Sequence, residues 1–161
     1  MPNLLSKAAE AILADAVHAE LYASHLYRHA ANQMQRAGYF GAAKWFKAEA
    51  ATEDKHYQRL ADYANDMGSV VTLPTIEGHP DEPLTTLRDA LQLGFQTERN
   101  LLDDYAEWFG KADPVTAQFL LQFIEIQRKS VGEYLDWLTR LDRVGSDNAA
   151  MLLIDRELGA D

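Results

Sequence analysis

The chain has 161 residues, of which 47% are hydrophobic, and it carries a formal net charge of −10 with no cysteine. This length fits a single domain over residues 1–161 that can bury a sizeable core. The lack of cysteine excludes disulfides, thiolate metal ligands and cysteine nucleophiles, and the acidic charge argues against nucleic acid or an anionic membrane as a partner.

The N-terminal stretch Met1–Ala14 carries Lys7 and Glu10 where an export signal needs an unbroken apolar core. Nowhere does an apolar run approach the ~20 residues that span a membrane. We therefore expect a cytoplasmic protein without a membrane partner.

The first helix is predicted over about Leu4–Gln35. Its inward stripe has helical spacing and consists of Leu13, Ala16, Val17, Glu20, Ser24, Tyr27, Ala31 and Met34. Glu20 is the anomaly, a carboxylate in the middle of an apolar or small-residue face, and Tyr27 follows two turns later. The short break at Ala37-Gly38-Tyr39 predicts a second helix that folds back antiparallel to the first.

The second helix is predicted over Gly41–Met67 and ends at Gly68, a common C-terminal signal. It contains Glu53-Asp54-Lys55-His56, in which Glu53 and His56 lie on one helix face about one turn apart. In four-helix bundles that bind two metal ions, Glu-x-x-His pairs and single glutamates project inward. Glu49, one turn before Glu53, is an additional candidate ligand, although for Glu49 and Asp54 a solvated charge is the commoner role.

The segment Val70–Pro83 cannot be helical, because it contains three prolines and a glycine. Extended, its roughly 14 residues cross about 40 Å, which is also the length of a 27-residue helix at about 1.5 Å per residue. The segment can therefore run the length of the bundle, so that the third helix starts beside the start of the second and lies parallel to it. Long crossovers of this kind are known in four-helix bundles.

The third helix is predicted from near Leu84 to Phe109-Gly110, with Thr85 or Thr86 as its cap. Its apolar stripe is interrupted by Glu98, and Tyr105 follows seven residues later. The Glu20/Tyr27 spacing of the first helix thus occurs a second time.

The fourth helix follows Asp113-Pro114, an N-cap with proline at the first helical position, and runs to about Val144. Gln127 is the polar residue on its inward stripe of Leu120, Phe123, Ile124, Gln127, Val131, Tyr134, Leu135 and Leu138. A short final helix, Ala149–Leu158, has an apolar patch that needs a partner in the bundle or on another subunit. We predict an all-α fold, a four-helix bundle with a long crossover and a short fifth helix.

This bundle would bring Glu20, Glu53 and Glu98 together in its middle, with no Arg or Lys on the same stripes. Three unpaired carboxylates cannot all stay ionised in an apolar interior. Two divalent cations would resolve the conflict, with Glu53 bridging both, Glu20 and His56 completing one site, Glu98 completing the other, and Gln127 beside it. Iron, manganese and zinc all suit carboxylate and imidazole ligands.

Each of these residues alone is commoner in a structural role, and only their combination favours a metal site. The remaining candidates of the same chemistry are His18, His25 and His79. They lie off the inward stripes or in the crossover, and we expect no metal role for them.

Over Leu4–Leu158 the chain resembles the non-haem ferritins of bacteria. The resemblance is strongest in Glu20-Leu-Tyr-Ala-Ser-His-Leu-Tyr27, in the second helix around Glu53-Asp-Lys-His56, and in Leu153-Ile-Asp-Arg-Glu-Leu158. It implies a ferritin-like fold that forms a homo-oligomeric hollow shell of twenty-four subunits. It also implies a di-iron ferroxidase centre formed by Glu20, Glu53, His56, Glu98 and Gln127, with Tyr27 beside it.

The same resemblance implies that Fe²⁺ is oxidised by dioxygen or hydrogen peroxide and stored as a ferric oxide mineral. Haem is not expected, because no methionine precedes Met67 in the second helix. The third iron site of some bacterial ferritins would need carboxylates where Arg128, Lys129 and Ser130 stand, although Glu49 leaves a modified site open. Val115–Gln122 has no charged residue, which leaves the access route for iron undecided.

Two other functions remain open from the sequence. A di-iron or dimanganese peroxidase or oxygenase usually carries two Glu-x-x-His pairs, and Gln127 stands where the second would be expected. A non-catalytic shell or interaction protein would need no complete ligand set.

Overall fold

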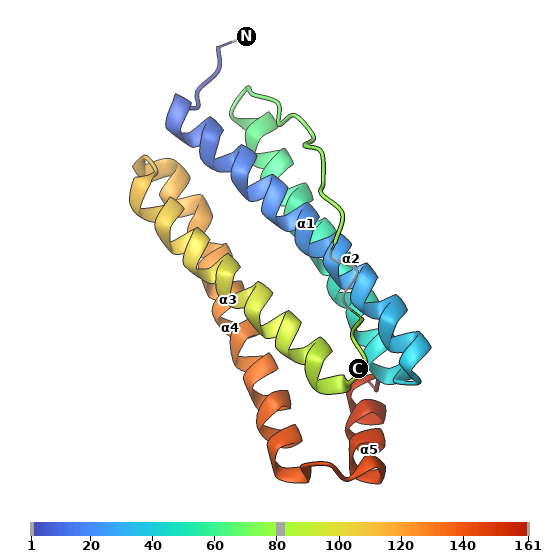
Figure 1. Ribbon diagram of the computed structural model, residues 1–161. Coiled ribbons are helices and arrows are strands. Elements are labelled where there is room, and N and C mark those ends of the chain that lie inside the picture. Colours follow the sequence, from blue (N-terminus) through green and yellow to red (C-terminus); the bar gives the residue numbers. More distant parts are fainter. Residues whose placement is uncertain (1, 80–82, 161) are drawn as a thin grey trace.

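The computed structural model describes residues 2–79 and 83–160, and every regular element within them is an α-helix. The helices are α1 (Lys7–Ala37), α2 (Phe40–Asp66), α3 (Leu87–Lys111), α4 (Pro114–Val144) and α5 (Asn148–Leu158). The pair α1/α2 packs against the pair α3/α4, and α5 lies across one end of the bundle (Figure 1). No helix in the described ranges is long and apolar enough to cross a membrane. The predicted all-α bundle with a short fifth helix is confirmed.

Local capping chemistry sets where the helices begin. The Ser6 side chain accepts a hydrogen bond from the Ala9 amide, so α1 begins at Lys7 rather than at the predicted Leu4. Thr86 and Asp89 form a capping box that starts α3 at Leu87, three residues later than predicted. The predicted cap at Asp113 is confirmed, because its carboxylate accepts the amides of the first turn of α4.

The connection between α2 and α3 runs along α1 for most of the bundle's length, so that α3 starts beside the start of α2 and lies parallel to it (Figure 1). Gly68 reverses the chain after α2 with φ of +76°, a conformation that favours glycine. The amide of Leu4 then donates to the carbonyl of Met67 at 2.9 Å. The long crossover is confirmed for the described residues, while residues 80–82 of the predicted segment lie outside them.

The short helix α5 docks on the N-terminus of α2. Tyr39 offers no side-chain cap, and the Asp155 carboxylate supplies it by accepting the amides of Gly41 at 3.0 Å and Ala42 at 2.7 Å. A Cβ at Gly41 would lie 1.7 Å from the Asp155 carbonyl oxygen, so only glycine permits this approach. The apolar patch of α5 is divided, because Ile154 is buried and Leu153 remains 52% exposed.

The inward stripe predicted for α1 is buried throughout, whereas in that of α4 Ile124 and Val131 are only half-buried and one residue points outward. Leu135 is 46% exposed instead of buried. Its neighbour Tyr134 takes the inward position, where its ring fits against the bare backbone of Gly94. Adjacent residues on a helix point about 100° apart, so α4 buries one of the two and exposes the other.

Candidate metal centre

Each of the four long helices contributes polar side chains to the interior of the bundle. Glu20 from α1 and Glu98 from α3 are fully buried, as is Gln127 from α4, and α2 supplies Glu53 and His56 at 2% and 5% exposure. Charged side chains are almost never buried this completely without a partner. The five residues named from the sequence are therefore all interior, as predicted for inward-facing positions.

Three of these residues lie close enough to share one ion. One ligand atom each from Glu20, Glu53 and His56 lies within 4.8 Å of the others. His56 Nδ1 is 2.6 Å from Glu53 Oε2 and 3.5 Å from Glu20 Oε2. Oxygen and nitrogen ligands bind zinc-like divalent ions at about 2.0–2.2 Å. Two ligand atoms on one such ion are therefore at most about 4.4 Å apart, which is close to the separations within this cluster.

Two tyrosine–glutamate hydrogen bonds cross between α1 and α3. Tyr27 on α1 donates to Glu98 Oε1 on α3, and Tyr105 on α3 donates to Glu20 Oε1 on α1. Burial raises the pKa of both phenols well above the ordinary value, with nearby glutamates adding to the shift, so both stay protonated donors. Tyr105 was absent from the predicted site, and the repeated Glu-to-Tyr spacing was the only signal of it in the sequence.

Each of the two glutamates keeps its second oxygen without a hydrogen bond, although Glu20 Oε2 lies 3.5 Å from His56 Nδ1. Glu20 Oε2, Glu98 Oε2 and both side-chain polar atoms of Gln127 are buried and make no hydrogen bond. Leaving a buried polar group unsatisfied costs about 1–3 kcal/mol. Tyrosine therefore fixes one oxygen of each glutamate, and the other remains available to a ligand.

Burial and nearby negative charge raise the pKa of two of these carboxyl groups, those of Glu53 and Glu98. Burial raises the pKa of Glu53 well above its ordinary value, and the negative charges of Glu20 and Glu98 raise it further. Burial likewise raises the pKa of Glu98 to about 8, although the hydrogen bond from Tyr27 opposes the shift. Divalent cations would remove both causes, since they neutralise the charge and replace the lost hydration.

The α4 face of the site is lined by Phe123 and Gln127, one helical turn apart. The Phe123 ring meets His56 edge-on at a centroid distance of 5.9 Å and stacks on Tyr105 at 4.9 Å. Gln127 lies on the same buried face of α4. An amide there offers a neutral oxygen and a donor, unlike the charged groups on the other three helices.

Glu49 is not the solvated charge that the sequence favoured. Burial raises its pKa to about 7, with the charge of Glu133 as the next cause, and the Tyr134 hydroxyl donates to it at 3.3 Å.

Asp54 behaves more nearly as predicted, since it is partly exposed and accepts hydrogen bonds from Ser24 at 2.7 Å and Arg28 at 2.5 Å. Arg128 pairs with exposed Glu125 at 2.8 Å, away from the buried carboxylates.

Comparison with known proteins gives a consistent result. A family model described as a ferritin-like domain matches residues 10–144. The chain is 28% identical over 160 residues to a probable bacterial non-heme ferritin-like protein of Haemophilus influenzae, covering 97% of this chain and 96% of that protein. It is 32% identical over 136 residues to the soma ferritin of Lymnaea stagnalis, covering 80% and 78% of the two chains.

Among solved structures, the fold is similar to an engineered closed form of the Archaeoglobus fulgidus ferritin. The TM-score is 0.93 at 25% sequence identity, with 98% of each chain covered. An open-pore ferritin of the same organism gives a TM-score of 0.92 at 25% identity, covering 97% of this chain and 98% of that one.

Proposed function

This chain belongs to the ferritin family, and we propose that it oxidises Fe²⁺ at a di-iron centre and stores the ferric product. The centre consists of Glu20, Glu53, His56, Glu98 and Gln127. The observation that carries the proposal is a buried set of carboxylate, imidazole and amide groups in which four polar atoms make no hydrogen bond. The names of the relatives, which are ferritins and bacterial non-heme ferritins, favour iron over other divalent metals.

The proposed ligand roles follow from the contacts of each side chain. Glu53 has the most contacts with the other ligands, because it shares a cluster with Glu20 and His56 and the charge of Glu98 raises its pKa. It is the carboxylate that would bridge two ions. Glu20 and His56 complete one site and Glu98 completes the second, with Gln127 beside the pair. Tyr27 and Tyr105 each hold one oxygen of Glu98 and Glu20, so that the second oxygen of each glutamate would be available to a metal ion.

Two ions at one site match the electron count of the reaction. Each Fe²⁺ gives one electron. Two electrons reduce dioxygen to hydrogen peroxide with the uptake of two protons, or they reduce hydrogen peroxide to two waters with the uptake of two protons. No one-electron oxygen radical needs to leave the site. Protons are released when iron binds, because Glu53 and Glu98 have raised pKa values in the metal-free protein.

The proposal includes a homo-oligomeric shell of twenty-four copies that holds the ferric oxide. Contact with other copies suits the exposed apolar side chains of α4 and α5, including Leu121, Leu135, Leu152 and Leu153. Native mass spectrometry would give the number of subunits directly. A cytoplasmic location and the lack of haem remain predictions from the sequence.

Rapid-mixing absorbance spectroscopy tests the proposed activity. Two Fe²⁺ per subunit added to aerobic apoprotein should give a fast oxidation phase that saturates at that ratio. The phase should disappear in Glu53→Ala and persist in Glu125→Ala, which changes a glutamate on the exposed face of α4. Oxidation by Glu53→Ala at the parent rate would contradict the site, and a parent without a fast phase would leave a non-catalytic shell.

A further inference from the structure

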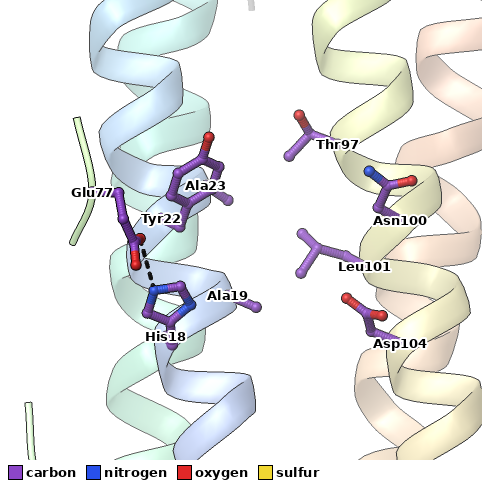
Figure 2. Close-up of a pocket in the computed structure, with 9 residues that line it drawn as sticks. All are labelled: His18, Ala19, Tyr22, Ala23, Glu77, Thr97, Asn100, Leu101 and Asp104. Atoms are coloured by element: carbon purple, nitrogen blue, oxygen red, sulfur yellow. Dashed lines mark hydrogen bonds and ion pairs between the residues drawn. The ribbon is translucent and has the colours of Figure 1, made fainter. Parts of the chain in front are cut away.

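A groove opens to solvent between α1 and α3 (Figure 2). Its volume is about 370 Å³. Polar side chains form its walls, with His18 on α1, Glu77 on the crossover, and Asn100 and Asp104 on α3. Two of its apolar lining residues, Ala23 and Leu101, are themselves almost fully buried and form its floor.

The floor lies at the level of the proposed di-iron centre. Ala23 is three residues from Glu20 on α1, and Leu101 is three residues from Glu98 on α3, so each shares a helix face with its glutamate. The Tyr105–Glu20 and Tyr27–Glu98 hydrogen bonds cross between the same two helices. The floor therefore lies one helical turn from two glutamates that each keep a buried oxygen without a hydrogen bond.

The walls of the groove carry the charge that attracts a cation. His18 Nε2 lies 3.0 Å from Glu77 Oε2 on one wall, and Asp104 stands on the opposite wall (Figure 2). Partial burial raises the pKa of Asp104, and the charges of Glu107, Asp103 and Asp15 raise it further, which indicates a concentration of negative charge there. None of the residues that line the groove is a lysine or an arginine.

The size of the groove suits an ion that keeps its water shell. A divalent ion with six waters occupies roughly 200 Å³, since each water takes about 30 Å³. The wall residues are not among the groups close enough to chelate a bare ion directly within the described ranges. The carboxylates and the imidazole on the walls would instead form hydrogen bonds with the waters bound to the ion.

A hollow on the surface of α4 offers a contrast. It is lined by Gln118, Leu121, Gln122, Ile124 and Glu125. Its only carboxylate, Glu125, is paired with Arg128 at 2.8 Å and Lys129 at 3.7 Å. That surface therefore presents little net charge to a cation, in agreement with the uncharged stretch Val115–Gln122.

We propose that the α1/α3 groove is a capture site, where a hydrated divalent cation binds between the His18–Glu77 pair and Asp104 before it passes the Ala23–Leu101 floor to Glu20 and Glu98. The inference rests on the proposed function, because it supplies that centre with its metal. His18, for which the sequence suggested no metal role, acquires one through a contact with a residue 59 positions away. The last step needs only a rearrangement of Leu101 beside the small side chain of Ala23.

The test separates the arrival of metal from its final binding. The groove variant combines Glu77→Gln with Asp104→Asn, and Asp62→Asn on the exposed face of α2 is the matched control. Co²⁺ is mixed anaerobically with each apoprotein, and its absorbance bands report its arrival at the centre. We expect at least a tenfold slower second-order rate at low ionic strength for the groove variant, with two Co²⁺ per subunit still bound at equilibrium.

Ionic strength and a steric variant give independent readouts. The parent rate should fall steeply as salt is added, and the groove variant should lose most of that dependence. Ala19→Trp, which places an indole in the groove, should also slow the arrival of Co²⁺, whereas Gln118→Trp in the α4 hollow should not. Parent rates in both groove variants, or slowing by Gln118→Trp alone, would overturn the proposal. A parent that binds no Co²⁺ at equilibrium would contradict the di-iron centre itself.

Discussion

The interior of this bundle contains two layers that differ in whether their buried polar groups are hydrogen-bonded within the protein. The metal layer consists of Glu20, Glu53, His56, Glu98 and Gln127. The aromatic layer consists of Trp45, Phe46, Tyr134 and Trp137, whose rings meet at centroid distances of 6.1–6.5 Å. Trp45 donates to the Tyr134 hydroxyl at 3.4 Å, and that hydroxyl donates to Glu49.

The polar groups of the aromatic layer are hydrogen-bonded within the protein, whereas the metal layer leaves four buried polar atoms without a hydrogen bond. If stability alone were selected, apolar side chains would be favoured over buried carboxylates in the metal layer. The contrast supports the proposal that metal ions from outside the chain complete the metal layer. The predictions below separate the layers by their response to metal, to pH and to substitution.

The largest effect should come from adding metal to the apoprotein. A ligand at about 1,000 times its Kd stabilises a protein by about 4 kcal/mol per site. Co²⁺ in such excess should therefore raise the Tm by roughly 10 °C or more, as measured by calorimetry. In Glu53→Ala the rise in Tm should be much smaller, because only weak binding at exposed side chains would remain. In Glu125→Ala the rise in Tm should equal that of the parent.

The second prediction concerns the pH dependence of the apoprotein. The pKa of Glu98 is raised to about 8 and that of Glu53 is raised as well, so their protonated forms favour the folded state. That stability is fully present below about pH 4.5 and is lost as pH rises through 8. Between pH 6 and pH 9 we expect a loss of the order of 2–3 kcal/mol in the free energy of unfolding.

Glu98→Gln provides the matching variant for this pH dependence. It keeps the shape of the side chain and removes its charge, so the loss of stability between pH 6 and pH 9 should become smaller. Chemical denaturation at several pH values measures both proteins. A parent apoprotein whose stability rises over this range would contradict the raised pKa values of the metal layer.

Substitution of Gly94 should affect the aromatic layer only. A Cβ at Gly94 would lie 2.3 Å from the Tyr134 ring, so Gly94→Ala forces that ring to move. Overpacking of this kind typically costs about 1–3 kcal/mol, which thermal unfolding would detect. The variant should still bind two Co²⁺ per subunit, and loss of both ions would show that the layers are not independent.

The smallest effect is expected for Tyr105→Phe, which removes one hydrogen bond to Glu20. Outer groups that orient a metal ligand typically contribute 10- to 100-fold in affinity, and we expect about the lower value. Calorimetric titration with Co²⁺ should show weaker binding at one of two sites and an unchanged stoichiometry. Equal weakening of both sites would argue against the assignment of Glu20 to a single ion.

Much of this architecture can be predicted from sequence because the signals are local. Asp113-Pro114 fixes the start of α4, and the apolar periodicity of α1 identifies Glu20 as an inward carboxylate. The starts of α1 and α3 were predicted too early, because Ser6 and the Thr86–Asp89 capping box begin these helices further along the chain, and Thr86 is one of the two caps predicted for α3.

Contacts between distant segments were beyond the sequence. Whether Tyr105 reaches Glu20 depends on the register of α3 against α1, and the His18–Glu77 pair depends on the path of the crossover. The partial burial of Glu49 depends on Tyr134, which keeps its predicted inward position while its neighbour Leu135, predicted to face inward as well, is exposed. Helical periodicity is too coarse to choose between two adjacent residues of this kind.

Anomalous diffraction from a crystal soaked in Co²⁺ or Fe²⁺ would test the central claim most directly. The account predicts two peaks per subunit, one within bonding distance of Glu20, Glu53 and His56 and the other between Glu53 and Glu98. A crystal with no peak at these residues under saturating metal, or with metal bound only elsewhere, would contradict it.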